Sequence, residues 1–193
     1  MTARTVIITA DDLGLWPEVN DAVMAGYDAG IITSASLRVG ARASDAARNS
    51  AAMRPGLGVG LHLVLCEGQA TMPRKHISDL VDSGGNLPGQ PMEAAWLFRR
   101  GGGLREQLKT EIRGQIEKFL ASGLFMTHIS GHHHLHLHHN FPQLNNLRSI
   151  DKILLFLPLY LHYNHQDIDL HKFLRQIHKL LFDFGNLQDQ DNP

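Results

Sequence analysis

The sequence predicts an α/β fold whose strands run parallel, and two observations carry this prediction. Short, continuous runs of apolar and β-branched residues, such as Thr5–Ala10 and Leu57–Leu65, are typical of strands buried on both faces. Stretches with the spacing of amphipathic helices follow them, so that strand and helix alternate at least three times. In folds of this class, ligands bind at the carboxyl ends of the strands, which makes polar residues at those ends the candidates for a functional site.

Size and composition are typical of a soluble globular domain. The chain has 193 residues, of which 43% are hydrophobic and 19% charged, and its net charge of −1 offers no attraction for nucleic acid or an anionic membrane surface. The single cysteine, Cys66, excludes an internal disulfide framework and is expected to be an ordinary buried thiol. The N-terminal residues lack the apolar core of a signal peptide, and the apolar patch at 153–161 is too short to span a bilayer. We therefore expect no membrane span and a cytoplasmic location.

Two adjacent carboxylates follow the first predicted strand. Asp11 and Asp12 come directly after Thr5–Ala10, and acids beside a buried strand are unfavourable for folding unless something cationic receives them. The alternative interpretation is a turn in which Asp12 caps the next helix. On this motif alone, a cation site and a structural turn are equally good interpretations.

The next elements are placed from apolar spacing and from proline and glycine. The pattern predicts, in order, a helix that begins at Pro17 and ends before Gly30, a strand over 31–39, a helix over 44–53 and a strand over 57–65. His62 lies in the middle of the last strand, among apolar residues. A histidine in such a run is more often a core residue with a satisfied ring than a metal ligand.

A long insertion separates this strand from the last predicted helix. Residues 66–103 are irregular and rich in glycine and proline, with a short helical piece around 92–98. Long, glycine-hinged segments after a strand often cover a substrate, and a flexible connection is the alternative. An amphipathic helix over 104–120 follows, with Gly123 as its cap.

Seven of the thirteen residues in THISGHHHLHLHH, at 127–139, are histidine. Imidazole is the commonest protein ligand for transition metals, so a cluster this dense needs a reason. If the segment is extended, one face carries His128, Ser130, His132, His134, His136 and His138, and the other carries Ile129, His133, Leu135, Leu137 and His139. One face could then serve a site while Leu135 and Leu137 join the core. The alternative is a histidine-rich surface loop that binds metal incidentally.

Acids and histidines from three separate strands converge on one edge of the predicted sheet. One carboxylate and two imidazoles would make a three-ligand metal site with positions left open for water or substrate, as in catalytic rather than structural centres. A second carboxylate beside the ligands suits a general base, and the combination favours hydrolysis of an amide or ester carbonyl. The same ligand set also describes non-haem iron oxygenases, which are the competing chemistry.

Four motifs in order resemble the YdjC-like carbohydrate deacetylases over about residues 4–139. They are TADDLG at 9–14, TSASLRVG at 33–40, GLHL at 60–63 and THISGHHHLHLH at 127–138. The last is most similar to the hopanoid-biosynthesis branch of the family. The resemblance implies a distorted (β/α) barrel of the polysaccharide-deacetylase type. It also implies one divalent metal ion, Mg²⁺ or Zn²⁺, and removal of an N-acetyl group from an amino sugar, in an oligosaccharide or a glycosylated hopanoid lipid.

The resemblance also assigns roles to individual residues. Asp12, His62 and His132 would bind the metal, Asp11 would be the general base, and His134 and His136 would line the site or orient its partners. The family often carries an acid where 129–131 read Ile-Ser-Gly here, so a carboxylate that steadies a metal ligand is expected to be missing.

Residues 140–193 differ in character from the part that resembles the family. This segment contains one glycine, Gly185, and no alanine, and we find none of the family's later motifs in it. We therefore expect a catalytic region at 1–139, a divergent helical segment at 140–193 and an incomplete barrel. A homodimer could cover the barrel edges left exposed. The alternative function is a catalytically incomplete relative that binds metal or glycan without turnover.

Overall fold

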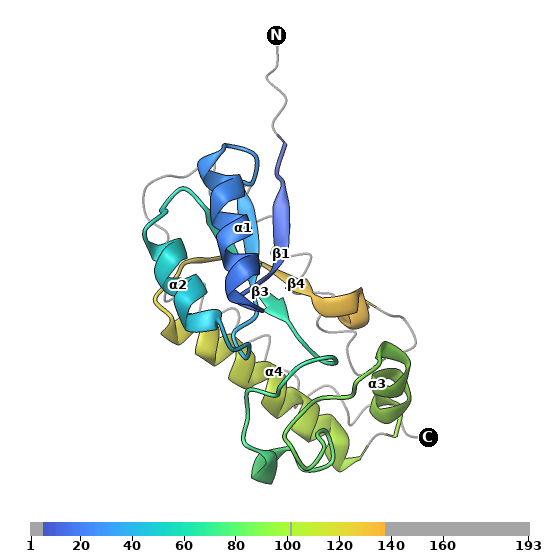
Figure 1. The fold of residues 1–193 in the computed structure, drawn as a ribbon. Helices are drawn as coiled ribbons and strands as arrows, with labels where there is room; N and C mark the ends of the chain where they lie inside the picture. Colours follow the sequence, from blue (N-terminus) through green and yellow to red (C-terminus); the bar gives the residue numbers. More distant parts are fainter. Residues whose placement is uncertain (1–5, 101, 138–193) are drawn as a thin grey trace, which may run out of the picture. The chain divides into compact units, whose positions relative to one another are not determined.

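Four parallel strands form the centre of the described chain, which confirms the predicted α/β class. The computed structural model describes residues 6–100 and 102–137. The strands pair in the order β1 (Thr9–Leu13), β2 (Ser34–Leu37), β3 (Gly58–Leu63) and β4 (Met126–Gly131), all parallel (Figure 1). Because the strands are parallel, their carboxyl ends meet at one edge of the sheet.

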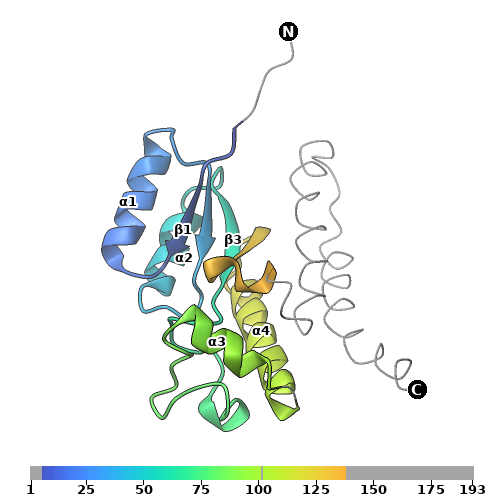
Figure 2. The same ribbon diagram turned by 90° about the vertical axis from the view of Figure 1, so that its right-hand side faces the viewer.

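Helices connect and cover these strands. α1 (Pro17–Asp28) and α2 (Ser44–Ala52) lie side by side against β1 and β2, and α4 (Gly103–Ala121) packs against β3 (Figures 1 and 2). α1 begins with proline at its first position, where the missing N–H costs nothing, and ends two residues before Gly30. The predicted helices at 44–53 and 104–120 agree with α2 and α4 to within one residue at each end.

The first strand lies later in the sequence than predicted. β1 begins at Thr9, and the side chains of Val6, Ile7 and Ile8 are 71%, 62% and 44% exposed, so the prediction of a strand at Thr5–Ala10 buried on both faces is wrong. Among the described residues, β1 is an edge strand of the sheet and no strand lies beyond it to cover these side chains. Asp11 and Asp12 therefore lie inside β1, not in a turn that caps α1.

The segment between β3 and α4 is fastened to α4. It contains η1 (Arg74–His76) and α3 (Pro91–Phe98), the latter close to the predicted helical piece. The carboxylate of Glu111, which is 0% exposed, accepts hydrogen bonds from the backbone N–H groups of Thr71 and Met72 at 2.8 and 2.9 Å. Gln115 bonds both the N–H and the C=O of Val64, at 3.0 and 2.7 Å. This segment is thus built into the fold along α4.

The histidine segment is extended only as far as Gly131. From there the chain forms η2 (His132–Leu137), two short turns joined at His133 and His134, whose φ angles are +54° and +52°. The predicted alternation of faces is therefore wrong beyond Gly131. Leu135 is buried, as expected, at 5% exposure. The side chains of His136 and Leu137, and all of 138–193, lie outside the described residues.

Close packing between β3 and β4 requires a glycine at position 60. A Cβ added to Gly60 would lie 2.5 Å from both the carbonyl oxygen and the ring Nδ1 of His128. The ring of His128 contacts Ser36 Oγ at 3.0 Å through Nε2 and Thr127 Oγ1 at 2.9 Å through Nδ1. Both ring nitrogens are thus partnered, and His128 is a packed structural residue.

The expectation for the single cysteine is confirmed. Cys66 is 0% exposed, and burial raises the pKa of its thiol to about 11, as for an inert buried cysteine. None of the helices at 6–100 and 102–137 combines the length and apolar character needed to cross a bilayer.

Candidate metal centre

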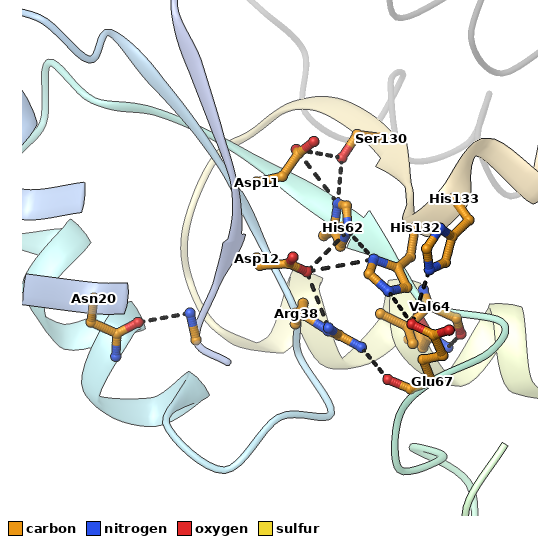
Figure 3. Close-up of polar contacts among 12 residues, drawn as sticks. Asp11, Asp12, Asn20, Arg38, His62, Val64, Glu67, Ser130, His132 and His133 are labelled. Carbon is orange, nitrogen blue, oxygen red and sulfur yellow. Dashed lines mark hydrogen bonds and ion pairs between the residues drawn. The ribbon is translucent and has the colours of Figure 1, made fainter. Parts of the chain in front are cut away.

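The structure brings Asp12, His62 and His132 together at the carboxyl edge of the sheet. Asp12 comes from β1, His62 from β3, and His132 is the first residue after β4 (Figure 3). His62 Nε2 lies 3.2 Å from His132 Nδ1 and 3.3 Å from Asp12 Oδ1, and the last two atoms are 3.6 Å apart. Two donor atoms from strands and one from the residue that follows a strand therefore face a common point.

These separations fit a single metal ion. Two ligand atoms each about 2.1 Å from an ion, at the angles of tetrahedral or octahedral coordination, lie roughly 3.0–3.4 Å apart. The three distances of 3.2, 3.3 and 3.6 Å are close to this range. Three ligands leave at least one coordination position open, which is the arrangement of a catalytic centre.

A bulge in β1 lets both adjacent acids reach the same histidine. In a regular strand, Asp11 and Asp12 would point to opposite faces. Between Ala10 and Leu13, however, β1 holds one residue more than β2, and Asp12 has a φ of +61°. As a result, Asp12 lies at Nε2 of His62, and Asp11 Oδ1 lies 3.6 Å from Nδ1 of the same ring.

His62 Nδ1, the ring nitrogen that points away from Asp12 and His132, is held by a chain of hydrogen bonds. We call such a nitrogen the outer nitrogen of the ring. Ser130 Oγ lies 2.8 Å from His62 Nδ1 and donates to Asp11 Oδ1 at 3.3 Å (Figure 3). Because the hydroxyl proton is directed to Asp11, the His62 Nδ1–H donates to Ser130, and the lone pair of Nε2 faces Asp12 and His132. The sequence analysis placed Ser130 on one face of the histidine segment but did not predict its contact with His62.

Arg38 is a second residue that sequence reasoning missed. Its side chain is 5% exposed, and its Nη1 donates to Asp12 Oδ1 at 3.1 Å while Nη2 donates to the carbonyl oxygen of Glu67 at 2.8 Å. A buried guanidinium needs such partners, because an unpaired buried charge is costly. Arg38 lies within the TSASLRVG motif, which was its only signal in the sequence.

Burial keeps the imidazoles neutral. Desolvation lowers the pKa of His62 to about 4, although Asp11 and Asp12 oppose this shift. Burial, followed by the charge of Arg38, also lowers the pKa of His132. Both rings therefore offer an unprotonated nitrogen near neutral pH, as a metal ligand must.

Glu67 lies beside Nε2 of His132, which is the outer nitrogen of that ring. Its Oε2 is 3.6 Å from His132 Nε2 and accepts a 2.9 Å hydrogen bond from His133 Nε2. The hydrogen bond with His133 is the main reason that the pKa of the Glu67 carboxyl lies below its ordinary value. A carboxylate at the far nitrogen of a ligating histidine orients the ring. The acid expected to be missing near 129–131 thus has counterparts in Asp11, acting through Ser130, and in Glu67.

Left-handed backbone is concentrated at this centre. The non-glycine residues with positive φ in the described chain are Asp12, Glu67, His133 and His134. Each such residue costs on the order of 1 kcal/mol or more, and strain of this kind clusters at functional sites. Asp12 is itself a predicted ligand, Glu67 faces His132, and His133 and His134 follow His132 in the chain.

His134 and His136 are the two residues expected to line the site, and the structure describes the side chain of the first. His134 is exposed, and its ring makes no hydrogen bond or ion pair with the described residues. The side chain of His136 lies outside the described part. The lining roles of both histidines stay predictions.

A cavity of about 400 Å³ adjoins the centre through Arg38 and Glu67. Its walls are formed by the segments that follow β1, β2 and β3 and by the insertion before α4. Trp16, half exposed, offers an aromatic face, while Arg42, Gln69 and Asn86 offer polar groups. Volumes of this order are typical of small-ligand sites.

Comparisons with known proteins agree with the sequence motifs. A sequence model of the family described as YdjC-like protein matches residues 5–147. The carbohydrate deacetylase of Geobacillus stearothermophilus is 37% identical over 145 residues, which cover 75% of this chain and 56% of that protein. The carbohydrate deacetylase of Clostridium beijerinckii is 36% identical over 133 residues, with 68% and 50% covered. The chain thus spans about half the length of the curated relatives it matches.

A solved structure shares the fold. The crystal structure of a protein from Enterococcus faecalis V583, provisionally described as a cellobiose-phosphate cleavage protein, superimposes with a TM-score of 0.58 at 25% identity. The superposition covers 90% of this chain and 64% of that one. The parallel strands of this chain therefore correspond to part of a larger barrel-like fold.

Proposed function

The chain belongs to the YdjC-like protein family, and on that basis we propose that it is a metal-dependent hydrolase that removes the acetyl group from an N-acetylated amino sugar. The observation that carries this proposal is the meeting of Asp12, His62 and His132, with donor atoms 3.2–3.6 Å apart. The relatives named carbohydrate deacetylases support the substrate class.

The proposed ion would be held by Asp12 Oδ1, His62 Nε2 and His132 Nδ1. When bound, a divalent ion polarises a carbonyl and lowers the pKa of water to roughly 7. The carboxylate oxygen suits Mg²⁺ and the two imidazoles suit Zn²⁺, so the donor set is compatible with either.

Asp11 is the proposed general base. Its side chain is 51% exposed, and only Oδ1 is used by Ser130, which leaves the other oxygen available for a proton from the attacking water. Asp11→Asn should abolish turnover while metal stays bound, because Asp11 is not among the proposed ligands. Full activity of this variant would overturn the assignment of the base.

The cavity beside Arg38 and Glu67 is the proposed place for the sugar. Trp16 can pack an apolar surface against a sugar ring, while Gln69 and Asn86 can bond its hydroxyl groups. An oligosaccharide and a glycosylated hopanoid lipid would both present an N-acetylglucosamine unit of this size.

Metal content followed by an acetate-release assay tests the proposal. The purified chain should contain one tightly bound divalent ion and release acetate from N-acetylglucosamine oligosaccharides or from an N-acetylglucosaminyl hopanoid. Assaying both substrates in parallel distinguishes the two branches of the family. An absolute need for ferrous ion and dioxygen would instead indicate the oxygenase chemistry.

Metal binding without turnover is the second candidate function. The observation that favours it is the change of composition after residue 139, where the chain contains one glycine and no alanine. Under this alternative, the ion binds with the same three ligands, but no acetate is released from any of these substrates.

A further inference from the structure

We propose that Glu67, His132 and His133 form a second site for a divalent transition-metal ion, which shares His132 with the first. This goes beyond the proposed deacetylase function, which calls for one ion held by Asp12, His62 and His132. The donor atoms of the three residues all lie within 4.8 Å of one another.

The geometry of Glu67 and His133 supports this site. Glu67 follows β3 and His133 lies in η2, far apart in sequence, yet Glu67 Oε2 lies 2.9 Å from His133 Nε2 (Figure 3). Both residues have left-handed backbone, with φ of +53° and +54°. Their side chains are 35% and 41% exposed, so an ion can enter from solvent without rearrangement of the core.

His132 has a different set of donors at each ring nitrogen. Its Nδ1 faces Asp12 and His62, and its Nε2 faces Glu67 Oε2 at 3.6 Å. An ion at the second site would replace the Nε2 proton, which is released to solvent. The ring then bridges two ions as an imidazolate, one at each nitrogen.

The donor set indicates which ions bind. Two imidazole nitrogens and one carboxylate oxygen favour Zn²⁺, Ni²⁺ and Cu²⁺ over Mg²⁺. Because two of its three ligands are partly exposed, and because His132 must lose a proton, the second site should bind more weakly than the first.

A Zn²⁺ titration of the metal-free protein tests the second site. The wild-type chain should bind one equivalent tightly and a further one more weakly. His133→Ala and Glu67→Gln should each lose one weak equivalent and keep the tight one, whose retention shows that both variants are folded. Asp12→Asn should do the reverse, weakening the tight equivalent and keeping the weak one.

His76→Ala is the control, because His76 is an exposed histidine on η1 and belongs to neither proposed set of ligands. This variant should bind as many equivalents as the wild type. Equal stoichiometry in the wild type, His133→Ala and Glu67→Gln would overturn the second site. This test measures only metal stoichiometry and does not use the acetate assay. Its result is therefore independent of whether the proposed hydrolase is active.

Cu²⁺ tests the shared ring directly. Two Cu²⁺ ions bridged by an imidazolate couple magnetically, so the electron paramagnetic resonance intensity of the doubly loaded wild type should fall well below that of two isolated ions. His133→Ala loaded with one Cu²⁺ should give the full intensity of one ion. Full intensity of two ions in the wild type would overturn the sharing of His132.

Discussion

The two imidazoles of the proposed metal centre, His62 and His132, are held in different ways. His62 lies within β3, its side chain is 3% exposed, and its outer nitrogen is hydrogen-bonded to Ser130 at 2.8 Å. His132 lies just after β4, its side chain is 15% exposed, and its outer nitrogen faces the partly exposed Glu67 across 3.6 Å. Packing within the sheet thus positions His62, whereas the carboxylate of Glu67 orients His132. Matching substitutions on the two sides should therefore have unequal effects.

His62→Ala should have the largest effect. It removes a proposed ligand and leaves a buried gap beside Ser130 and Asp11, so metal affinity should fall by more than about 100-fold and the free energy of unfolding by about 2–3 kcal/mol. His132→Ala should lose a similar amount of affinity but less stability, because its ring is less buried. Calorimetric metal titration and urea denaturation measure the two quantities. His76→Ala, on exposed η1, is the control, and equal destabilisation by the two site variants would break the comparison.

Acid should destabilise the metal-free protein through His62. Its pKa is lowered to about 4 in the folded chain, against an ordinary value of 6.5, so the unfolded state binds more protons between these values. The contribution, roughly 3 kcal/mol, is fully present above pH 6.5 and is lost as the pH falls towards 4. Urea denaturation across this pH range measures it. His62→Asn should reduce the change of the free energy of unfolding with pH. If this change is the same in the variant as in the wild type, other groups cause the pH dependence.

Ser130→Ala should weaken metal binding by about 10–100-fold, because the His62 ring loses the partner that fixes its tautomer. Isothermal titration with Zn²⁺ measures the change. Ser130→Thr keeps the hydroxyl and should restore most of the affinity. If the threonine variant binds as weakly as the alanine variant, the serine acts through packing instead.

Glu67→Gln should have the smallest effect on the tight site, less than about 10-fold in affinity. The contact with His132 is long and Glu67 is partly exposed, so water competes with it. The same titration measures this variant beside Ser130→Ala. A larger loss in Glu67→Gln than in Ser130→Ala would reverse the comparison between the two imidazoles.

Sequence periodicity predicted most of the helices and strands, and the family motifs predicted that Asp12, His62 and His132 meet. α2 and α4 were placed almost to the residue because apolar spacing and alanine content specify them locally. The β1 bulge and the turn at His132 could not be predicted, because each depends on pairing with a neighbouring strand. Arg38 and Glu67 were missed for the same reason, since only the folded chain brings them to Asp12 and His132.

Three features expected from the sequence stay predictions. They are the division between a catalytic region at 1–139 and a divergent segment at 140–193, the homodimer, and the cytoplasmic location. The family match ends at residue 147, and the residues from 138 onward lie outside the described structure. These predictions call for experiments on the whole chain.

The contact between Arg38 and Asp12 has a consequence for how the protein is assembled. The guanidinium contacts the same oxygen that an incoming ion would take, so the carboxylate has a cationic partner in the folded chain without the ion. Synthesis of the polypeptide and acquisition of metal can then be separate events in time. Metal present during folding and metal added afterwards should give the same metal-loaded protein.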